Sequence, residues 1–198
     1  PADEYIAWFW PIAEQIHRVL RADGSFVMEL GGAWNPGSGT RSLFTYELLL
    51  KLGTIFHLAQ DFYWHNPSRL PTPAEWVTVR RIRVKDAINC VWWLSPTPWP
   101  KASNRRVLAP YSESMKDLLR NGYRAKLRPS GHDISKKFSI NNGASIPPNL
   151  LAIAHTESNS SYIRYCRAKG LKVHPARFPT ELPEFFIRML TDPGDVVV

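Results

Sequence analysis

A stretch that joins aromatic residues to an Asn-Pro turn is the first part of the chain whose residue types could do chemistry. Residues 61–73 read DFYWHNPSRLPTP, so Tyr63 and Trp64 shortly precede Asn66 and Pro67. Flat aromatic faces beside a rigid turn could hold a nucleobase that has been taken out of the nucleic-acid stack. A strand that simply runs into a rigid turn explains the same pattern, and the segment alone leaves both interpretations open.

A second candidate site has two prolines four positions apart. It reads HPARFP and comprises His174, Pro175, Ala176, Arg177, Phe178 and Pro179. The prolines fix the backbone and leave amide and carbonyl groups pointing outward, which suits contact with a small ligand. An ordinary turn before a helix is the alternative.

The excess of positive over negative charge lies in the middle of the chain. Residues 69–137 contain 15 Lys or Arg against 5 Asp or Glu, whereas the rest of the chain contains 10 against 12, for a net charge of +8. Such a block favours a polyanionic partner, because each phosphate that Lys or Arg neutralises releases counterions. A basic, solubilising surface is the alternative.

Two parts of this block are candidate contacts to DNA. In the first, Arg81, Arg83 and Lys85 alternate with apolar residues, so a strand would place the three cations on one face and Ile82 and Val84 on the other. A solvated edge strand protected by charge is equally compatible with this pattern. The second part, residues 124–137, reads RAKLRPSGHDISKK and is turn-rich, so it is either a loop that clamps DNA or a disordered loop. Its candidate contacts to phosphates or base edges are Arg128, His132 and Lys136.

Other kinds of site find little support in the sequence. It contains no GxSxG, HExxH, P-loop or CxxC motif, and its six histidines form no cluster with metal-ligand spacing. The two cysteines, Cys90 and Cys166, lie far apart, which favours a reducing, intracellular compartment. No apolar run is long enough for a membrane span, and we expect neither a membrane nor a metal as partner.

The elements that must position these residues follow an α/β pattern. Apolar spacing predicts helices over residues 6–20, 43–52, 160–169 and 183–190, and short apolar runs predict strands over 25–30, 56–64, 171–173 and 195–198. This order predicts a layered sheet, in which ligands bind at the carboxyl ends of the strands. The middle of the chain is richer in proline and predicts only two strands within 75–95 and one helix over 112–120. We therefore expect an α/β domain formed by 1–66 and 150–198, with an insertion at 67–149.

Long stretches in the same order give the chain a family resemblance. They cover nearly its whole length: EYIAWFWPIAEQIHRVLRADGSFVMELGG, QDFYWHNPSRLP, IRVKDAINCVWWLSPTPWPK, LAPYS, RPSGHDIS, GASIPPNLL and HPARFPTELPEFFIRMLTDPGDVVV. The chain resembles the β-group DNA amino-methyltransferases of bacterial restriction–modification systems, most closely the cytosine-N4 type. The resemblance implies a Rossmann-like, S-adenosylmethionine-dependent methyltransferase sheet, twisted and mostly parallel, with an inserted DNA target-recognition region. It also implies methyl transfer from S-adenosylmethionine to the N4 amine of cytosine in double-stranded DNA, in the cytoplasm of a bacterium.

The resemblance also assigns residues. It places the base near Asn66 and Pro67, and the methionine end of the cofactor at the HPARFP element, where many relatives have Lys in place of Phe178. In the family a Ser-Pro-Pro-Tyr tetrapeptide accepts hydrogen bonds from the target amine, and a glycine-rich loop holds the cofactor. Neither sequence occurs in these 198 residues, so we expect no catalytic residue of that kind in the chain itself. No cysteine is required for the reaction.

Three alternatives remain. Adenine-N6 methylation uses the same fold, and the tetrapeptide that separates the two chemistries is not in the chain. A catalytically inactive DNA-binding module would bind DNA but not the cofactor, and a basic structural protein would bind DNA without sequence preference. The oligomeric state is left open by the sequence.

Overall fold

The computed structural model describes residues 2–122, 129–131, 139–174 and 177–198. By their contacts the residues form two compact units, residues 1–102 with 149–198 and residues 103–148. The larger unit contains α1 (Ala2–Val19), β1 (Phe26–Leu30), α2 (Phe44–Leu52), β2 (His57–His65), the π-helical turn η1 (Glu75–Val79), β3 (Ile88–Ser95), β4 (Leu150–Ala152), α4 (Ser161–Ala168) and α5 (Glu181–Leu190). The smaller unit contains the 3-10 turn η2 (Asn104–Val107) and α3 (Glu113–Asn121).

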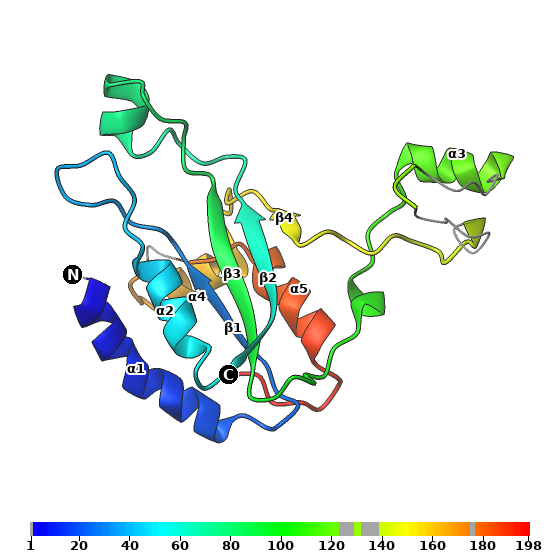
Figure 1. Ribbon diagram of the computed structural model, residues 1–198, viewed down its shortest axis with the longest axis horizontal. Helices are drawn as coiled ribbons and strands as arrows, with labels where there is room; N and C mark the ends of the chain where they lie inside the picture. Colours follow the sequence, from blue (N-terminus) through cyan, green and yellow to red (C-terminus); the bar gives the residue numbers. More distant parts are fainter. Residues whose placement is uncertain (1, 123–128, 132–138, 175–176) are drawn as a thin grey trace. The chain divides into compact units, whose positions relative to one another are not determined.

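The sheet of the larger unit is mixed and has the strand order β1-β3-β2-β4 (Figure 1). β3 pairs antiparallel with both β1 and β2, and β2 pairs parallel with β4. β1, β2 and β4 therefore run in one direction, as expected for a mostly parallel sheet, and β3 runs in the opposite direction. The Asn66 amide, directly after β2, donates to the Ala87 carbonyl at 2.8 Å and extends the antiparallel pairing of β2 with β3 by one residue.

Helices cover both faces of this sheet, as the α/β pattern predicts (Figure 1). One face packs Met28, Trp92 and Leu94 against residues of α1 and α2, including Ala13 and Leu48. On the other face, the Phe62 ring lies 5.1 Å from the Phe186 ring of α5. Because the central strand is covered on both sides, its residues from Val91 to Ser95 are all buried. Each apolar side chain buried in this way stabilises the fold by roughly 1.5–3 kcal/mol.

The segment between β2 and β3 differs from its prediction, because only one of the two expected strands forms. Residues 80–87 form an irregular loop, and the alternating strand proposed for Arg81 to Lys85 is wrong. Arg81 has a φ of 56°, a left-handed conformation that no strand residue adopts. The amides of Ile82 and Arg83 both donate to the carbonyl of Trp76 instead of to a neighbouring strand. Ile82 and Val84 are left 64% and 87% exposed, whereas the prediction buried them.

Two other predicted strands, 171–173 and 195–198, do not form either. Gly170 has a φ of 63°, and the Leu171 amide donates to the Cys166 carbonyl, so residues after α4 close that helix instead of extending into a strand. A strand that the sequence did not predict, β4, forms at 150–152. Asn149 precedes it and fixes it to β2, since its side chain donates to the Asp61 carbonyl and its own carbonyl accepts from the Tyr63 amide.

The smaller unit has its own set of contacts. The Ser112 side chain caps α3 by accepting from the Met115 amide, and Ala109 pairs with Ser145 in an isolated antiparallel bridge. Its range, 103–148, is narrower than the expected insertion at 67–149, because β3 lies within the sheet of the larger unit. None of the described helices is long and apolar enough to cross a membrane.

Candidate functional site

The turn after β2 is built around the side chain of Asn66. Asn66 is 8% exposed, and its Oδ1 accepts hydrogen bonds from the amide and the hydroxyl of Ser68, at 3.1 and 2.7 Å. The same oxygen accepts from the His155 amide at 3.1 Å. The side chain of Asn66 therefore joins its own turn to the chain that follows β4, at the carboxyl ends of two parallel strands.

Tyr63 and Trp64, predicted near the same turn, have different environments because successive strand residues face opposite sides of a sheet. Trp64 is only 6% exposed, and its indole Nε1 donates to the Ile153 carbonyl at 2.8 Å. Tyr63 is 37% exposed and donates its hydroxyl to Asp61 at 2.8 Å. This hydrogen bond raises the pKa of Tyr63 above its usual value. Of the two rings, only that of Tyr63 offers an accessible surface.

The HPARFP element lies against the same strand end. Its Phe178 ring is 48% exposed and stands 6.5 Å from the ring of Trp64, at an interplanar angle of 70°. Pro179 is fully buried, and the His174 amide donates to the Tyr162 hydroxyl at 3.2 Å. Pro175 and Ala176 lie outside the described residues. The two candidate turns of the sequence are thus brought together through the contact between Trp64 and Phe178.

Glu157 anchors the far side of this element. Its carboxylate accepts from the amide and the hydroxyl of Thr180, at 2.8 and 3.1 Å, and its backbone carbonyl accepts from the Arg177 guanidinium at 3.2 Å. Together with the bond to Tyr162, these contacts fix the described residues of the element to the chain between β4 and α4.

Two buried polar atoms beside this contact have no hydrogen-bond partner among the described residues, Nδ1 of His155 and Nε of Arg177. The His155 ring stands edge-on to Trp64 at 6.3 Å. Buried polar atoms are destabilising when they are left unpaired, so most of them in folded proteins have a partner. The two atoms, together with the exposed ring of Phe178, fit a small ligand that has both polar and flat parts.

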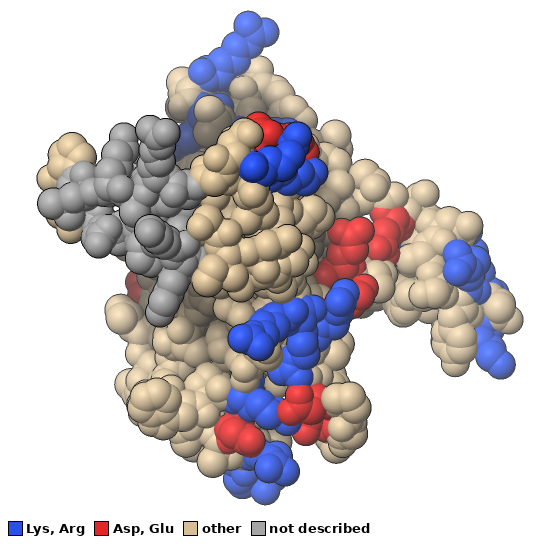
Figure 2. All heavy atoms as spheres, turned by 90° about the vertical axis from the view of Figure 1, so that its right-hand side faces the viewer, with Lys and Arg blue, Asp and Glu red and all other residues tan. Residues whose placement is uncertain are grey.

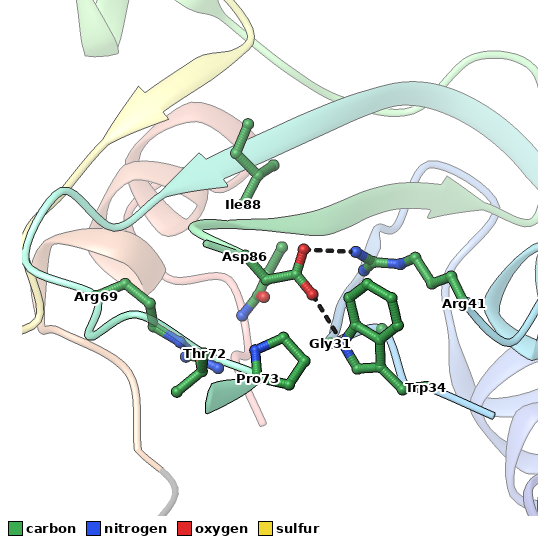
Figure 3. Close-up of a pocket in the computed structure, with 10 residues that line it drawn as sticks. Gly31, Trp34, Arg41, Arg69, Thr72, Pro73, Asp86 and Ile88 are labelled. Carbon is green, nitrogen blue, oxygen red and sulfur yellow. Dashed lines mark hydrogen bonds and ion pairs between the residues drawn. The ribbon is translucent and has the colours of Figure 1, made fainter. Parts of the chain in front are cut away.

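A polar hollow of about 260 Å³ opens beyond the ends of β1 and β2 (Figure 3). Asp86 is at its centre and accepts from Nε1 of Trp34 at 3.1 Å and from the Arg41 guanidinium at 3.0 Å. The lining residues are Gly31, Gly32, Trp34, Arg41, Arg69, Thr72, Pro73, Asp86, Ile88 and Asn89. The hollow is bounded by the loop after β1 on one side and by the connection from β2 to β3 on the other.

Glu29 lies next to this hollow on β1 and accepts from the Asn89 side chain at 2.5 Å. Burial raises the pKa of Glu29, and the hydrogen bond from Asn89 and the charge of Arg69 only partly offset that effect. Burial also raises the pKa of the Cys90 thiol on β3, so that it stays protonated at neutral pH and is a poor nucleophile. Among the described residues no cluster of His, Cys, Asp and Glu could hold a metal ion.

The three cations of the loop before β3 are not equivalent. The Arg83 guanidinium donates to the Gly39 carbonyl and lies 5.2 Å from the centre of the Trp34 ring. The Lys85 ammonium donates to the carbonyls of Pro67 and Arg69, at 3.5 and 3.1 Å. For the Arg81 side chain, no hydrogen bond or ion pair is found within the part of the chain that the structure describes. On the face seen in Figure 2, Lys and Arg side chains gather in groups, and Asp and Glu lie beside several of them.

The remaining predicted DNA contacts, Arg128, His132 and Lys136, lie outside the described residues. Sequence reasoning also missed several residues that the fold brings to the site, namely Gly31, Gly32, Arg41, Arg69, Asp86, His155 and Glu157. For the glycine pair a signal was available, because two glycines directly after a buried strand permit close approach to the backbone. For Asp86 and Glu157 the partners are distant in sequence, and nothing local marks them.

Comparisons with known proteins place the chain in a family. The model of the N6_N4_Mtase family, described as DNA methylase, matches residues 1–198. The chain is 54% identical over 200 residues to the Type II methyltransferase M.PvuII of Proteus hauseri, and the match covers 98% of this chain and 60% of that protein.

A solved structure named PvuII DNA methyltransferase (cytosine-N4-specific) superposes with a TM-score of 0.75 and 44% identity in the structural alignment. That alignment covers 98% of this chain and 57% of the solved chain. The chain thus spans about three fifths of the length of the relatives it matches. At this identity the likeness extends to the fold, a mixed α/β sheet of the methyltransferase type. The chain therefore belongs to the N6_N4_Mtase family of DNA methylases.

Proposed function

We propose that the protein is a site-specific DNA methyltransferase of a restriction–modification system, which moves a methyl group from S-adenosylmethionine to the N4 amine of cytosine. The observation that carries the proposal is the meeting of the Asn66 turn with the HPARFP element, through the ring contact of Trp64 with Phe178. A base held at the first segment and a methyl donor held at the second would share one cleft. The names of the two relatives support the same chemistry.

The cofactor, when bound, supplies a sulfonium-activated methyl group. The site would hold the amine nitrogen of cytosine in line with this methyl group, and the proton that the amine loses on transfer would pass to solvent. The residues of this chain contribute position and not covalent chemistry, since holding two reactants in line accounts for much of the rate of such transfers. Asn66 keeps the ends of β2 and β4 together, and the protonated Cys90 thiol takes no part.

The residues beside Phe178 fit the expected cofactor. Nε of Arg177 and Nδ1 of His155, which have no partner among the described residues, would bind its polar groups, and the exposed ring of Phe178 would pack against a flat or apolar part. A Lys at position 178 would add a charge that this chain lacks. Recognition here therefore depends on the Arg177 side chain and on backbone groups.

Double-stranded DNA is the proposed partner of the basic residues. We assign phosphate or base contacts to Arg81, Arg83, Lys85, Arg128, His132 and Lys136. Contacts to phosphates would set the register of the protein on the duplex, and contacts to base edges would select the sequence. Among the described members of this set, Arg81 is the one whose side chain is not engaged in contacts with other described residues.

Product analysis tests the proposal directly. The protein encoded by the complete gene is incubated with DNA and S-adenosylmethionine that carries a labelled methyl group, and the DNA is digested to nucleosides for mass spectrometry. We expect label in N4-methylcytosine. Label in N6-methyladenine would instead establish the alternative amino-methyltransferase chemistry.

Calorimetry separates the inactive alternatives. Binding of S-adenosylmethionine by the same protein is expected, together with a preference for one duplex sequence over random DNA. DNA binding without any cofactor affinity would identify an inactive DNA-binding module. Equal affinity for all duplexes would identify a basic protein with no specific target.

A further inference from the structure

The hollow beyond β1 and β2 is polar and carries an excess of positive charge. Figure 3 shows Arg69 and Arg41 approaching it from opposite sides, with Asp86, Trp34 and Pro73 between them. Both carboxylate oxygens of Asp86 already accept hydrogen bonds, one from Trp34 and one from Arg41. Two guanidinium groups line the hollow against one engaged carboxylate, and Glu29 beside it is half-buried and already accepts from Asn89. The groups left available in the hollow therefore favour an anionic ligand.

Arg69 is held by its backbone and free at its side chain. Its amide donates to the Asn66 carbonyl at 3.1 Å, and its carbonyl accepts from the Lys85 ammonium at 3.1 Å. No hydrogen bond or ion pair engages its guanidinium within the described residues, although its charge acts on the half-buried Glu29. A guanidinium on a fixed backbone, with its N–H groups available, can bind an oxyanion through two hydrogen bonds.

On the opposite side of the hollow, the Arg41 guanidinium lies close to the backbone of Gly32. A Cβ at Gly32 would lie 1.8 Å from the Arg41 guanidinium, so only glycine lets Arg41 lie in its observed position. Asp86 fixes one terminal nitrogen of Arg41 and leaves its other N–H groups available. The neighbouring Gly31 has only the Asn89 side chain within 4 Å of where its Cβ would be, so the backbone there is open to a ligand.

We propose that this hollow binds one backbone phosphate of the target strand, beside the nucleotide whose base reaches the Asn66 turn. Arg69 donates two hydrogen bonds to the phosphate, and Arg41 supplies the second charge. Asp86 is a positioning residue that orients Arg41 and Trp34. The inference rests on the proposed function and deepens it, because Arg69 follows Asn66 by three residues on the same turn and thus ties a phosphate contact to the position of the base.

A phosphodiester suits the site better than a base does. The fork of a guanidinium matches two oxygens of a phosphate, whereas the one carboxylate that could accept from a base amine is already engaged. The backbone hydrogen bonds of Arg69 fix it on the turn after β2, so its side chain can reach only a small part of the duplex. Arg69 should therefore act on a single phosphate and not on the duplex as a whole.

The test uses the protein encoded by the complete gene and a short duplex that the wild type methylates. One methylphosphonate, which is a neutral linkage, replaces each phosphate near the target base in turn. Dissociation constants are measured for the wild type, Arg69→Ala and Arg69→Lys at several salt concentrations. Arg21→Ala is the matched control, since Arg21 lies before β1, at the opposite end of that strand, and its side chain is exposed and forms an ion pair with Asp23.

We expect Arg69→Ala to weaken binding about tenfold and to lower the slope of log K against log salt by about 1. One neutral linkage should weaken wild-type binding by a similar factor and leave Arg69→Ala unaffected. Arg69→Lys should recover part of the affinity, and Arg21→Ala should behave as the wild type. The losses from the Arg69 substitution and from the one neutral linkage should therefore not add, because both remove the same contact.

Three results would overturn the inference while the methylation activity stands. They are an unchanged affinity for Arg69→Ala, losses that add at every linkage, and coupling of Arg69 to removal of a base instead of to a neutral linkage. The last result would place a base in the hollow. A wild-type protein that methylates no DNA would overturn the proposed function itself, and this inference with it.

Discussion

At the scale of single residues, the site depends on side chains that form hydrogen bonds with other parts of the protein. Asn66 Oδ1 accepts three hydrogen bonds, and Lys85 donates to two carbonyls of the same turn. Asn66 Oδ1 thus positions other groups and is not itself available to a ligand, and Lys85 keeps only part of its donor capacity for a phosphate. The available groups are the fewer ones that the fold leaves unengaged, such as the guanidinium of Arg81.

Salt dependence should separate Arg81 from its neighbour Arg83. Arg81→Ala is expected to weaken DNA binding several-fold and to lower the salt slope by about 1, because one phosphate contact is lost. Arg83→Ala should mainly lower the melting temperature, since Arg83 holds the loop through Gly39 and Trp34. Lys85→Ala should lower the slope by less than Arg81→Ala does. Titrations at several salt concentrations measure the slopes, and an unchanged slope for Arg81→Ala would remove that residue from the interface.

Glu29 should make stability depend on pH. Its folded-state pKa is raised by burial, so the unfolded chain loses this proton at a lower pH and stability falls as pH rises from the ordinary glutamate value through the raised one. Glu29→Gln keeps an acceptor for Asn89 without a charge and should melt at a higher temperature than the wild type at pH 7. The difference should shrink as the pH is lowered toward 4. Thermal unfolding at both pH values measures it, and a difference that grows at low pH would contradict the argument.

At the scale of elements, helices could be predicted from the sequence better than strands. The helical spacing of apolar residues predicted α1, α2, α4 and α5 to within a few residues, because each buries one face against the sheet. Alternation failed at residues 81–85, where a left-handed residue prevents a strand. β4 has three residues, too few for any periodic pattern, and is defined by its pairing with β2.

The candidate site could be predicted only in part for the same reason. Its two turns are local in sequence, and their proline and aromatic residues marked them. Their meeting through Trp64 and Phe178 joins residues more than a hundred positions apart. The bond that Asn66 accepts from His155, on the segment after β4, joins residues 89 positions apart. Such contacts follow from strand order, which local spacing does not determine.

The N-cap of α4 offers a test at this scale. The Ser160 side chain accepts from the Ile163 amide, and α4 carries Tyr162, whose hydroxyl holds the HPARFP element through the His174 amide. Ser160→Ala should destabilise the larger unit by about 1 kcal/mol, lower its melting temperature by about 2–4 °C and weaken cofactor binding. Ser112→Ala removes the equivalent cap of α3 in the smaller unit and is the matched control. Cofactor affinity that falls equally in both variants would contradict the assigned role of α4.

At the scale of the whole molecule, the chain divides its tasks between two units. The sheet, the two candidate turns and the hollow all belong to residues 1–102 and 149–198. Residues 103–148 contain 9 of the 15 Lys and Arg of the basic segment 69–137. Such a division predicts that cofactor binding and sequence selection can be separated.

Replacement of residues 104–147 by a flexible Gly-Ser linker tests this division. We expect the larger unit to keep its fold and the protein to keep cofactor affinity, because the sheet and its covering helices lie wholly in that unit. Preference for one duplex sequence should disappear, while some nonspecific DNA binding remains through Arg69 and Arg81. Circular dichroism, calorimetry and competition with random duplexes measure the three properties. Loss of the fold on replacement would show that the units are not independent.

The double hydrogen bond of Asn149 to β2 has a consequence for how such proteins can diverge. The chain re-enters the sheet at a point where Asn149 bonds to the backbone of Asp61 and Tyr63, and β4 then pairs with β2. A gene that acquired a different segment between these fixed ends by recombination would encode a protein with the same chemistry and a different DNA target sequence. New methylation patterns could then arise in one exchange, without many small steps through nonfunctional intermediates.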